Sequence, residues 1–139
     1  MVARSRVGFA LSLALLVSAC GMKENMEQAD REIERFHAYY DKQDYAAIWR
    51  TTSGEFRKIT KEKEFEKLLA AVRTKLGAVK KAEQAGWQAN TTNGVSTVVI
   101  NTKTAFEKGE GIETFTYVKQ DSGLKLLGYN INSAALIYN

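Results

Sequence analysis

The spacing of apolar residues changes at Gly77, and no other feature limits the possible folds of this chain as strongly. Before this glycine, apolar residues recur every three or four positions, which is typical of amphipathic helices. After it they alternate with polar residues, as in strands that bury one face. The order predicts an α+β fold, in which N-terminal helices pack on a curved four-stranded antiparallel sheet.

Three helices are expected before Gly77. The first carries a stripe of apolar residues at helical spacing, namely Met26, Ala29, Ile33, Phe36 and Tyr40. Asp44 is placed to cap a second, short helix over residues 45–49, since an aspartate accepts a hydrogen bond from the free amides of a first turn. A third helix runs from about residue 60 and stops at Gly77, because glycine tolerates the backbone conformation of a helix end.

The strands are separated by three turn signals. Asn93-Gly94 predicts a two-residue type I′ hairpin turn, which requires positive φ angles that these residue types tolerate. Residues 108–111 and 121–123 supply the other two turns, so the strands are expected to form a meander. In the last strand, alternation predicts one inward face formed by Leu127, Tyr129 and Ile131.

The chain begins with a segment typical of secretion signals. Arg4 and Arg6 precede an uncharged apolar stretch over residues 7–17, which has the length of a signal-peptide core. A transmembrane helix needs about 20 apolar residues, so a membrane span is not expected. Without these two arginines the 20 basic residues become 18, against 16 acidic ones. Acidic and basic residues also alternate over residues 61–67, so no nucleic-acid partner is expected.

The segment from Val17 to Cys20 (VSAC) resembles a lipobox. The resemblance implies cleavage between Ala19 and Cys20, and a membrane anchor of palmitate-type acyl chains on the Cys20 thiol. Gly21, where an aspartate is absent, implies by resemblance to Gram-negative lipoproteins a location at the outer membrane, facing the periplasm. The expected organisation is a signal peptide over residues 1–19, a lipidated tether over 20–25 and one α+β domain over 26–139.

The mature part also resembles a known fold family between about residues 26 and 133. The segments that carry the resemblance are residues 36–49 (FHAYYDKQDYAAIW), 72–73 (VR) with 76–79 (LGAV), 113–119 (ETFTYVK) and 128–131 (GYNI). They resemble a small bacterial lipoprotein domain of unknown function with the nuclear transport factor 2-like, cystatin-like fold. The resemblance implies a cone-shaped sheet wrapped on a helix, often with an apolar pocket, but no activity, because this fold supports enzymes, binding modules and scaffolds alike.

His37 is the only histidine, on the largely inward side of the first helix. In the ketosteroid isomerase-like and dehydratase-like relatives of this fold, a histidine or aspartate acts as a base. His37 with Asp41 is therefore the catalytic alternative. The other interpretation is a hydrogen-bonded histidine without chemistry, because no motif places a second titratable partner beside it.

Other chemistry finds little support in the sequence. One histidine and a lipid-modified cysteine leave only carboxylates as metal ligands, and Asp41 and Asp44 fit a turn and a helix cap. Glycine-rich phosphate loops and the G-x-S-x-G motif are absent from the sequence. No catalytic residue, metal or cofactor is predicted.

Aromatic residues supply the remaining pocket candidates, since tyrosine and tryptophan combine an apolar body with a polar tip. Tyr40, Trp49, Tyr117 and Tyr129 join His37 and Asp41 as candidates to line a pocket. Core packing is the alternative role for each aromatic residue.

These observations predict a non-catalytic, membrane-anchored envelope lipoprotein that binds an envelope protein or a small apolar ligand. The alternative is a small isomerase-like or dehydratase-like enzyme that uses acid-base chemistry in the cone pocket. A passive structural role in an assembly is a third interpretation.

Overall fold

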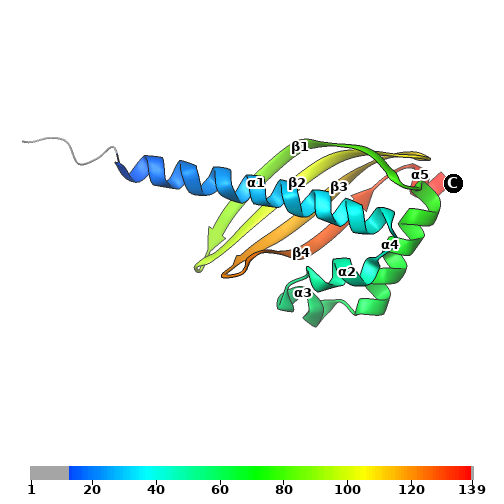
Figure 1. Ribbon diagram of the computed structural model, residues 1–139, viewed down its shortest axis with the longest axis horizontal. Coiled ribbons are helices and arrows are strands. Elements are labelled where there is room, and N and C mark those ends of the chain that lie inside the picture. Colours follow the sequence, from blue (N-terminus) through cyan, green and yellow to red (C-terminus); the bar gives the residue numbers. More distant parts are fainter. Residues whose placement is uncertain (1–12, 139) are drawn as a thin grey trace, which may run out of the picture.

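The computed structural model describes residues 13–138, with side chains from residue 21 onward. Five helices and four strands follow one another in this part of the chain (Figure 1). Their bounds are α1 (Leu13–Asp41), α2 (Tyr45–Arg50), α3 (Gly54–Ile59), α4 (Glu62–Leu76), β1 (Val79–Thr92), β2 (Val95–Phe106), β3 (Gly109–Gln120), β4 (Gly123–Asn132) and α5 (Ala135–Tyr138). The predicted α+β class is confirmed.

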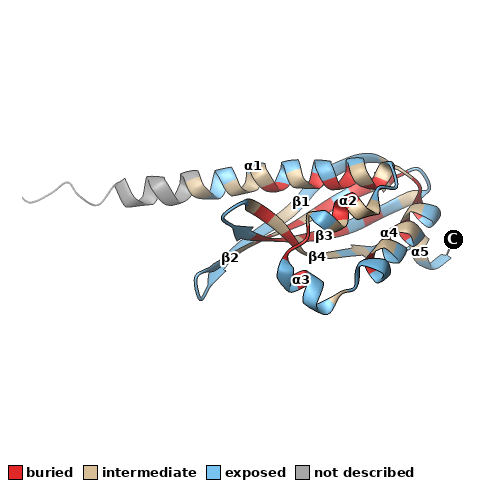
Figure 2. Cartoon of the chain, turned by 60° about the horizontal axis from the view of Figure 1, so that its bottom comes forward, coloured by how far each residue is buried: buried red, intermediate tan, exposed pale blue. Residues whose placement is uncertain are grey.

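The strands form one antiparallel sheet in the order β1-β2-β3-β4, a meander that does not close into a barrel. The turn between β1 and β2 has φ angles of 52° at Asn93 and 77° at Gly94, as a type I′ turn requires. Helix α1 lies along the concave side of the sheet, and both Figure 1 and Figure 2 show the sheet curving beside it.

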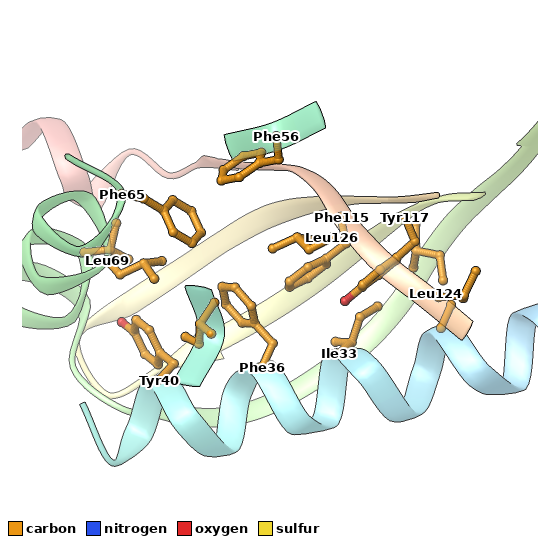
Figure 3. Close-up of a cluster of buried hydrophobic side chains, with 14 of the residues drawn as sticks. Ile33, Phe36, Tyr40, Phe56, Phe65, Leu69, Phe115, Tyr117, Leu124 and Leu126 are labelled. Carbon is orange, nitrogen blue, oxygen red and sulfur yellow. The ribbon is translucent and has the colours of Figure 1, made fainter. Parts of the chain in front are cut away.

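The apolar stripe of α1 faces the sheet, and Figure 2 shows buried residues on this side of the helix. Ala29, Ile33, Phe36 and Tyr40 are buried at spacings of three and four residues. Phe36 meets the Phe115 ring edge to face, with ring centroids 5.0 Å apart. Such aromatic pairs add to the free energy gained by burying apolar surface. Figure 3 shows the side chains of this core between α1, β3 and β4.

The short helix α2 packs against α1 and α4, and α3 lies beside β4 (Figure 1). Asp44 caps α2 as predicted, because its Oδ1 accepts a hydrogen bond from the Ala47 amide over 3.1 Å. Helix α3 was not predicted, although Ser53 caps it in the same way through the Phe56 amide. Phe56 and Phe65 pack edge to face and join α3 and α4 to the core (Figure 3). Helix α5 was not predicted either.

The predicted inward face of the last strand is wrong in part. A register shift lies opposite Thr116 and Tyr117, where Thr116 pairs with Gly128 and Tyr117 pairs with Leu126. Leu127 is thereby skipped in the pairing and is only half-buried, whereas Leu126 is fully buried. The alternation predicted from sequence fails because an extra residue in one strand reverses the side-chain direction beyond it.

The proposed signal peptide falls largely outside the described residues. Cys20 lies within α1, which continues without interruption across residues 20–25. Within the described part of the chain, no helix combines the length and the apolar character needed to cross a bilayer. The boundaries of the signal peptide, tether and domain stay predictions.

Candidate functional site

The most unusual residue of the core is a glutamate on β3. Glu113 is 1% exposed, between the inward positions of Gly111 and Phe115. Its neighbour Ile112 is 40% exposed on the opposite face of the sheet. An isoleucine in solvent beside a buried glutamate reverses the usual preference of both residue types. Polar partners must therefore compensate the burial of the carboxyl group.

Three side chains from three other elements bind the Glu113 carboxylate. His37 Nε2 of α1 lies 2.7 Å from Oε1, and the Thr104 hydroxyl of β2 donates to the same oxygen over 2.6 Å. The Tyr129 hydroxyl of β4 donates to Oε2 over 2.7 Å. Both oxygens act as acceptors, so we assign the proton of the His37 contact to Nε2. The network fixes the imidazole ring in one orientation.

Tyr129 is electrostatically coupled to this carboxylate. Burial raises the pKa of the Tyr129 phenol well above its usual value, and the negative charge of Glu113 and the hydrogen bond to it add to the shift. The phenol therefore keeps its proton and remains a donor. Tyr129 also packs against Phe36, with ring centroids 4.8 Å apart, so the network is part of the core.

His37 also borders a half-open cavity of about 260 Å³ between α1 and the first two strands. The cavity is lined by Asp30, Ile33, Glu34, His37, Ala82, Gln84 and Thr102. Two of the polar lining side chains, those of His37 and Thr102, are at least nine-tenths buried. Among the described residues, Arg73 Nε is the one fully buried side-chain nitrogen or oxygen without a hydrogen-bond partner. The second ring nitrogen of His37 and the Thr102 hydroxyl therefore open to the cavity, where a ligand can reach them.

The α1 wall of the cavity is acidic. Glu27, Asp30 and Glu34 are separated by three and four residues, which places them on one face of the helix together with His37. Asp30 and Glu34 are exposed residues. The partial burial of the Asp30 carboxyl raises its pKa, and the negative charges of Glu34 and then Glu27 raise it further. A cation in the cavity would relieve this repulsion.

The structure brings together two of the six candidate residues, His37 and Tyr129, through Glu113. Of the six, only His37 lines the acidic cavity. Tyr40 donates to the Gly77 carbonyl over 3.0 Å, and Asp41 accepts from the Val79 amide over 2.9 Å. These two residues fasten the end of α1 to the start of β1.

The other two candidates pack within the protein. Trp49 contacts the rings of Phe56 and Phe65 among the short helices. Tyr117 is 2% exposed and stacks on Phe115. Burial raises the pKa of its phenol well above the usual value.

Sequence reasoning missed the centre of the site. Glu113 shares its strand face with Phe115 and Tyr117, two residues apart each time, so the alternation of the strand already places it inward. That pattern was a usable signal for a buried carboxylate. Thr102 and Thr104 carried no such signal, because threonine is common on either face of a strand.

The described residues contain no group of three or more His, Cys, Asp or Glu side chains arranged to hold a metal ion.

Comparison with known proteins identifies the family but no activity. No curated protein matches the chain. Residues 33–129 match a family described as "Protein of unknown function (DUF4019)". The matched segment includes His37, Thr104, Glu113 and Tyr129, and it covers more than half of the 139 residues. The chain therefore belongs to the DUF4019 family of proteins of unknown function.

Proposed function

We propose that this protein is a non-catalytic binding domain, anchored to an envelope membrane by lipid on Cys20. In this proposal a cationic group binds in the acidic groove, which is the cavity between α1, β1 and β2. The observation that carries this proposal is the composition of the groove. Asp30 and Glu34 form one wall, and the second ring nitrogen of His37 and the Thr102 hydroxyl reach the same space. Two carboxylates together with these polar groups favour a ligand that carries positive charge and hydrogen-bond donors.

The lining favours a charged ligand over the small apolar ligand that was one of the two partners expected from the sequence. Ile33 and Ala82 are the apolar side chains of the groove, against two carboxylates, an amide, a hydroxyl and an imidazole. A cavity of about 260 Å³ is slightly below the usual range for drug-sized ligands. A primary amine or guanidinium on a short aliphatic stem matches both the volume and the charge.

A lipid anchor on Cys20 would hold the acidic groove close to the membrane. If Cys20 is the first residue of the mature protein, α1 itself links the lipid to the domain. A rise of about 1.5 Å per residue puts Cys20 about 14 Å along the helix from Ala29, the first buried residue. The groove would then face the periplasm within a short distance of the membrane. The nuclear transport factor 2-like resemblance is compatible with such a binding role.

The test compares a charged probe with its neutral isostere. The full chain, expressed in a bacterium and purified in a neutral detergent, is titrated with N-acetyl-lysine amide and with N-acetyl-norleucine amide by calorimetry. We expect the lysine probe alone to bind, and the double variant Asp30→Asn/Glu34→Gln to weaken binding at least about tenfold. Glu55→Gln, an exposed carboxylate on α3, is the control. Equal affinity for both probes, or no loss in the double variant, would overturn the proposal.

A second candidate function, that of an enzyme with acid-base chemistry, is favoured by the fixed orientation of His37. Because Nε2 is bound to Glu113, the other ring nitrogen is left for proton transfer in the cavity, as in an acid-base enzyme. This enzyme would use Glu113 as the residue that orients His37, not Asp41. If it exists, His37→Gln abolishes turnover while cation binding persists. A substrate turned over equally well by His37→Gln would exclude it.

A further inference from the structure

The two edges of the sheet differ in how they are protected. At β4, the Ser53 amide donates to the Leu126 carbonyl over 2.8 Å, and the Leu126 amide donates to Thr51 over 2.9 Å. The segment before α3 therefore covers this edge. At the other edge, β1 pairs with β2 and with no other strand among the described residues. An unpaired edge is a template for an added strand.

Strand β1 is long and exposed. It has 14 residues, and all of them except Val79 and Gly86 are exposed. Natural edge strands are usually short, or protected by prolines, lysines, β-bulges or inward-pointing charges. The first half of β1 has such protection, because it carries Lys80 and Lys81 and its pairing with β2 is irregular at two points, between Val79 and Lys81 and between Gln84 and Gly86. From Gly86 to Thr92 the pairing is regular, and this half of the edge contains no proline and no charged residue. The second half of β1 is therefore open to strand addition.

The inward side of β1 borders the acidic groove. Ala82 and Gln84 line the same cavity as Asp30 and Glu34 of α1. Trp87 pairs with the inward residue Ile100, which is fully buried, yet Trp87 itself is 47% exposed at the edge of the sheet. A strand added to β1 would extend the curved sheet further around α1. Its inward side chains would point toward the acidic wall.

We propose that β1 is the docking site for an extended segment of a partner protein, which pairs with β1 and places lysine or arginine at alternate positions into the groove. The inference rests on the proposed function, because it identifies the bound cation as a side chain of the partner. Backbone hydrogen bonds to β1 would supply affinity, and the acidic wall would select the side chains. Trp87 can add a contact with a cation over its ring.

Charge complementarity argues against a second copy of this chain as the occupant. If β1 paired with β1 of another copy, the uncharged inward residues of that strand would meet the groove. Lys81 lies on the outer face, where its Nζ is 2.6 Å from Glu83. A second copy of β1 would bring no cation to Asp30 and Glu34 from its inward face.

The hydrogen-bonding pattern of β1 indicates a substitution that tests whether the free edge of this strand binds another strand. Thr92 and Val95 close the two-residue turn, so this pair is hydrogen-bonded and the pairs alternate along the ladder. By this alternation the amide of Ala89 points away from β2, to the free edge. Ala89→Pro would remove a donor from the edge without removing a bond between β1 and β2.

The experiment titrates the full chain with a capped peptide that alternates threonine and lysine over seven residues. Two versions carry backbone N-methyl groups, one on the lysines and one on the threonines. In an antiparallel pair, residues with inward side chains at this part of the edge direct their amides toward β1. We therefore expect N-methylation of the lysines to weaken binding at least about tenfold, and N-methylation of the threonines to change it by less than about threefold.

Ala89→Pro should weaken binding of the unmodified peptide by about tenfold and leave binding of N-acetyl-lysine amide unchanged. If that variant does not fold, the two methylated peptides still decide the question. Equal binding of all peptides would overturn strand addition, while a continued dependence on Asp30 and Glu34 would leave the proposed function standing. If neither the peptide nor the lysine amide binds, both proposals fail. A dimer that Ala89→Pro dissociates would instead identify a second copy as the occupant.

Discussion

At the scale of single residues, the burial of the Glu113 carboxylate lowers the stability of the fold, but the carboxylate holds the His37 ring in one orientation. The burial of a charged carboxylate costs free energy that its three hydrogen bonds must offset. An apolar residue at this position would bury more simply, next to Phe115 and Tyr117. The benefit of the glutamate is that it holds His37 in one orientation at the edge of the groove.

Removal of this carboxylate should destabilise the domain strongly. Glu113→Ala leaves His37, Thr104 and Tyr129 without their shared acceptor, and we expect the free energy of unfolding to fall by about 3–5 kcal/mol. Tyr129→Phe removes one donor of the network and should cost about 1 kcal/mol. Urea denaturation at constant pH measures both. Equal losses in the two variants would show that the carboxylate does not organise the network.

Asp30 supplies a prediction for the pH dependence of stability. Its folded-state pKa is raised by burial, Glu34 and Glu27, so its favourable contribution exists below the unfolded pKa of about 4 and is lost as the pH rises through the folded value. Asp30→Asn removes this loss of stability. Solvent screening limits the resulting gain in the free energy of unfolding to about 0.5 kcal/mol or less at pH 7.

The difference in the free energy of unfolding between Asp30→Asn and the parent protein should disappear below about pH 4. Urea midpoints measured at about pH 7 and below about pH 4 test this expectation. Asp121→Asn, in the exposed turn between β3 and β4, is the matched control and should show no such pH-dependent difference. A cation in the groove should also bind more tightly as the pH rises through the folded-state pKa of Asp30, because the carboxylate then carries its full charge.

At the scale of elements, the connection from α4 to β1 is the most constrained junction. Gly77 ends α4 with a φ of 79°, and its carbonyl accepts the Tyr40 hydroxyl. A Cβ atom at this position would lie 2.8 Å from the Cβ of Glu107. Both the backbone conformation and the close approach therefore require glycine.

Gly77→Ala should lower the free energy of unfolding by about 1–3 kcal/mol. Gly54 is the matched control, because it begins α3 and a Cβ atom there would meet nothing within 4 Å. Gly54→Ala should be neutral, or stabilising by up to about 1 kcal/mol. Thermal denaturation of both variants measures the difference, and a similar melting temperature for the two would contradict the argument.

At the scale of the whole molecule, α1 contributes to the core and to the acidic wall, and it carries the cysteine proposed as the anchor. One face packs on the sheet, a neighbouring face forms the acidic wall, and the N-terminal end carries Cys20. The turns between β1 and β2 and between β3 and β4 lie toward the same end as the start of α1 (Figure 1). An anchor at Cys20 would place both turns toward the membrane and leave the length of β1 accessible from the side.

Cys20→Ser should move the protein from the membrane fraction to the soluble fraction of expressing cells, because the lipid would be its only strong membrane contact. Affinity for N-acetyl-lysine amide should not change, since the groove lies beyond the helical segment that follows Cys20. Mass spectrometry of the parent protein provides the control, through the added mass of the acyl chains. Retention of the variant in the membrane fraction would contradict the assignment.

The fold class followed from sequence because its causes are local. Helical spacing, alternation and the Asn93-Gly94 turn each act over a few residues. The Asp44 cap and the stop at Gly77 were predicted for the same reason, and both are confirmed. Helix α3 was missed, although Ser53 offered a cap signal, because six residues are too few to show a helical period.

The sequence by itself determined the order of helices and strands, the principal turns and the inward stripe of α1. Only the tertiary structure decided that Glu113 is the partner of His37, across 76 residues of sequence, and that Asp41 serves the backbone of β1 instead. It also decided which leucine of β4 faces inward, through the register shift at Tyr117. Secondary structure depends on neighbours along the chain, whereas these contacts depend on strand register and helix packing, which distant residues set together.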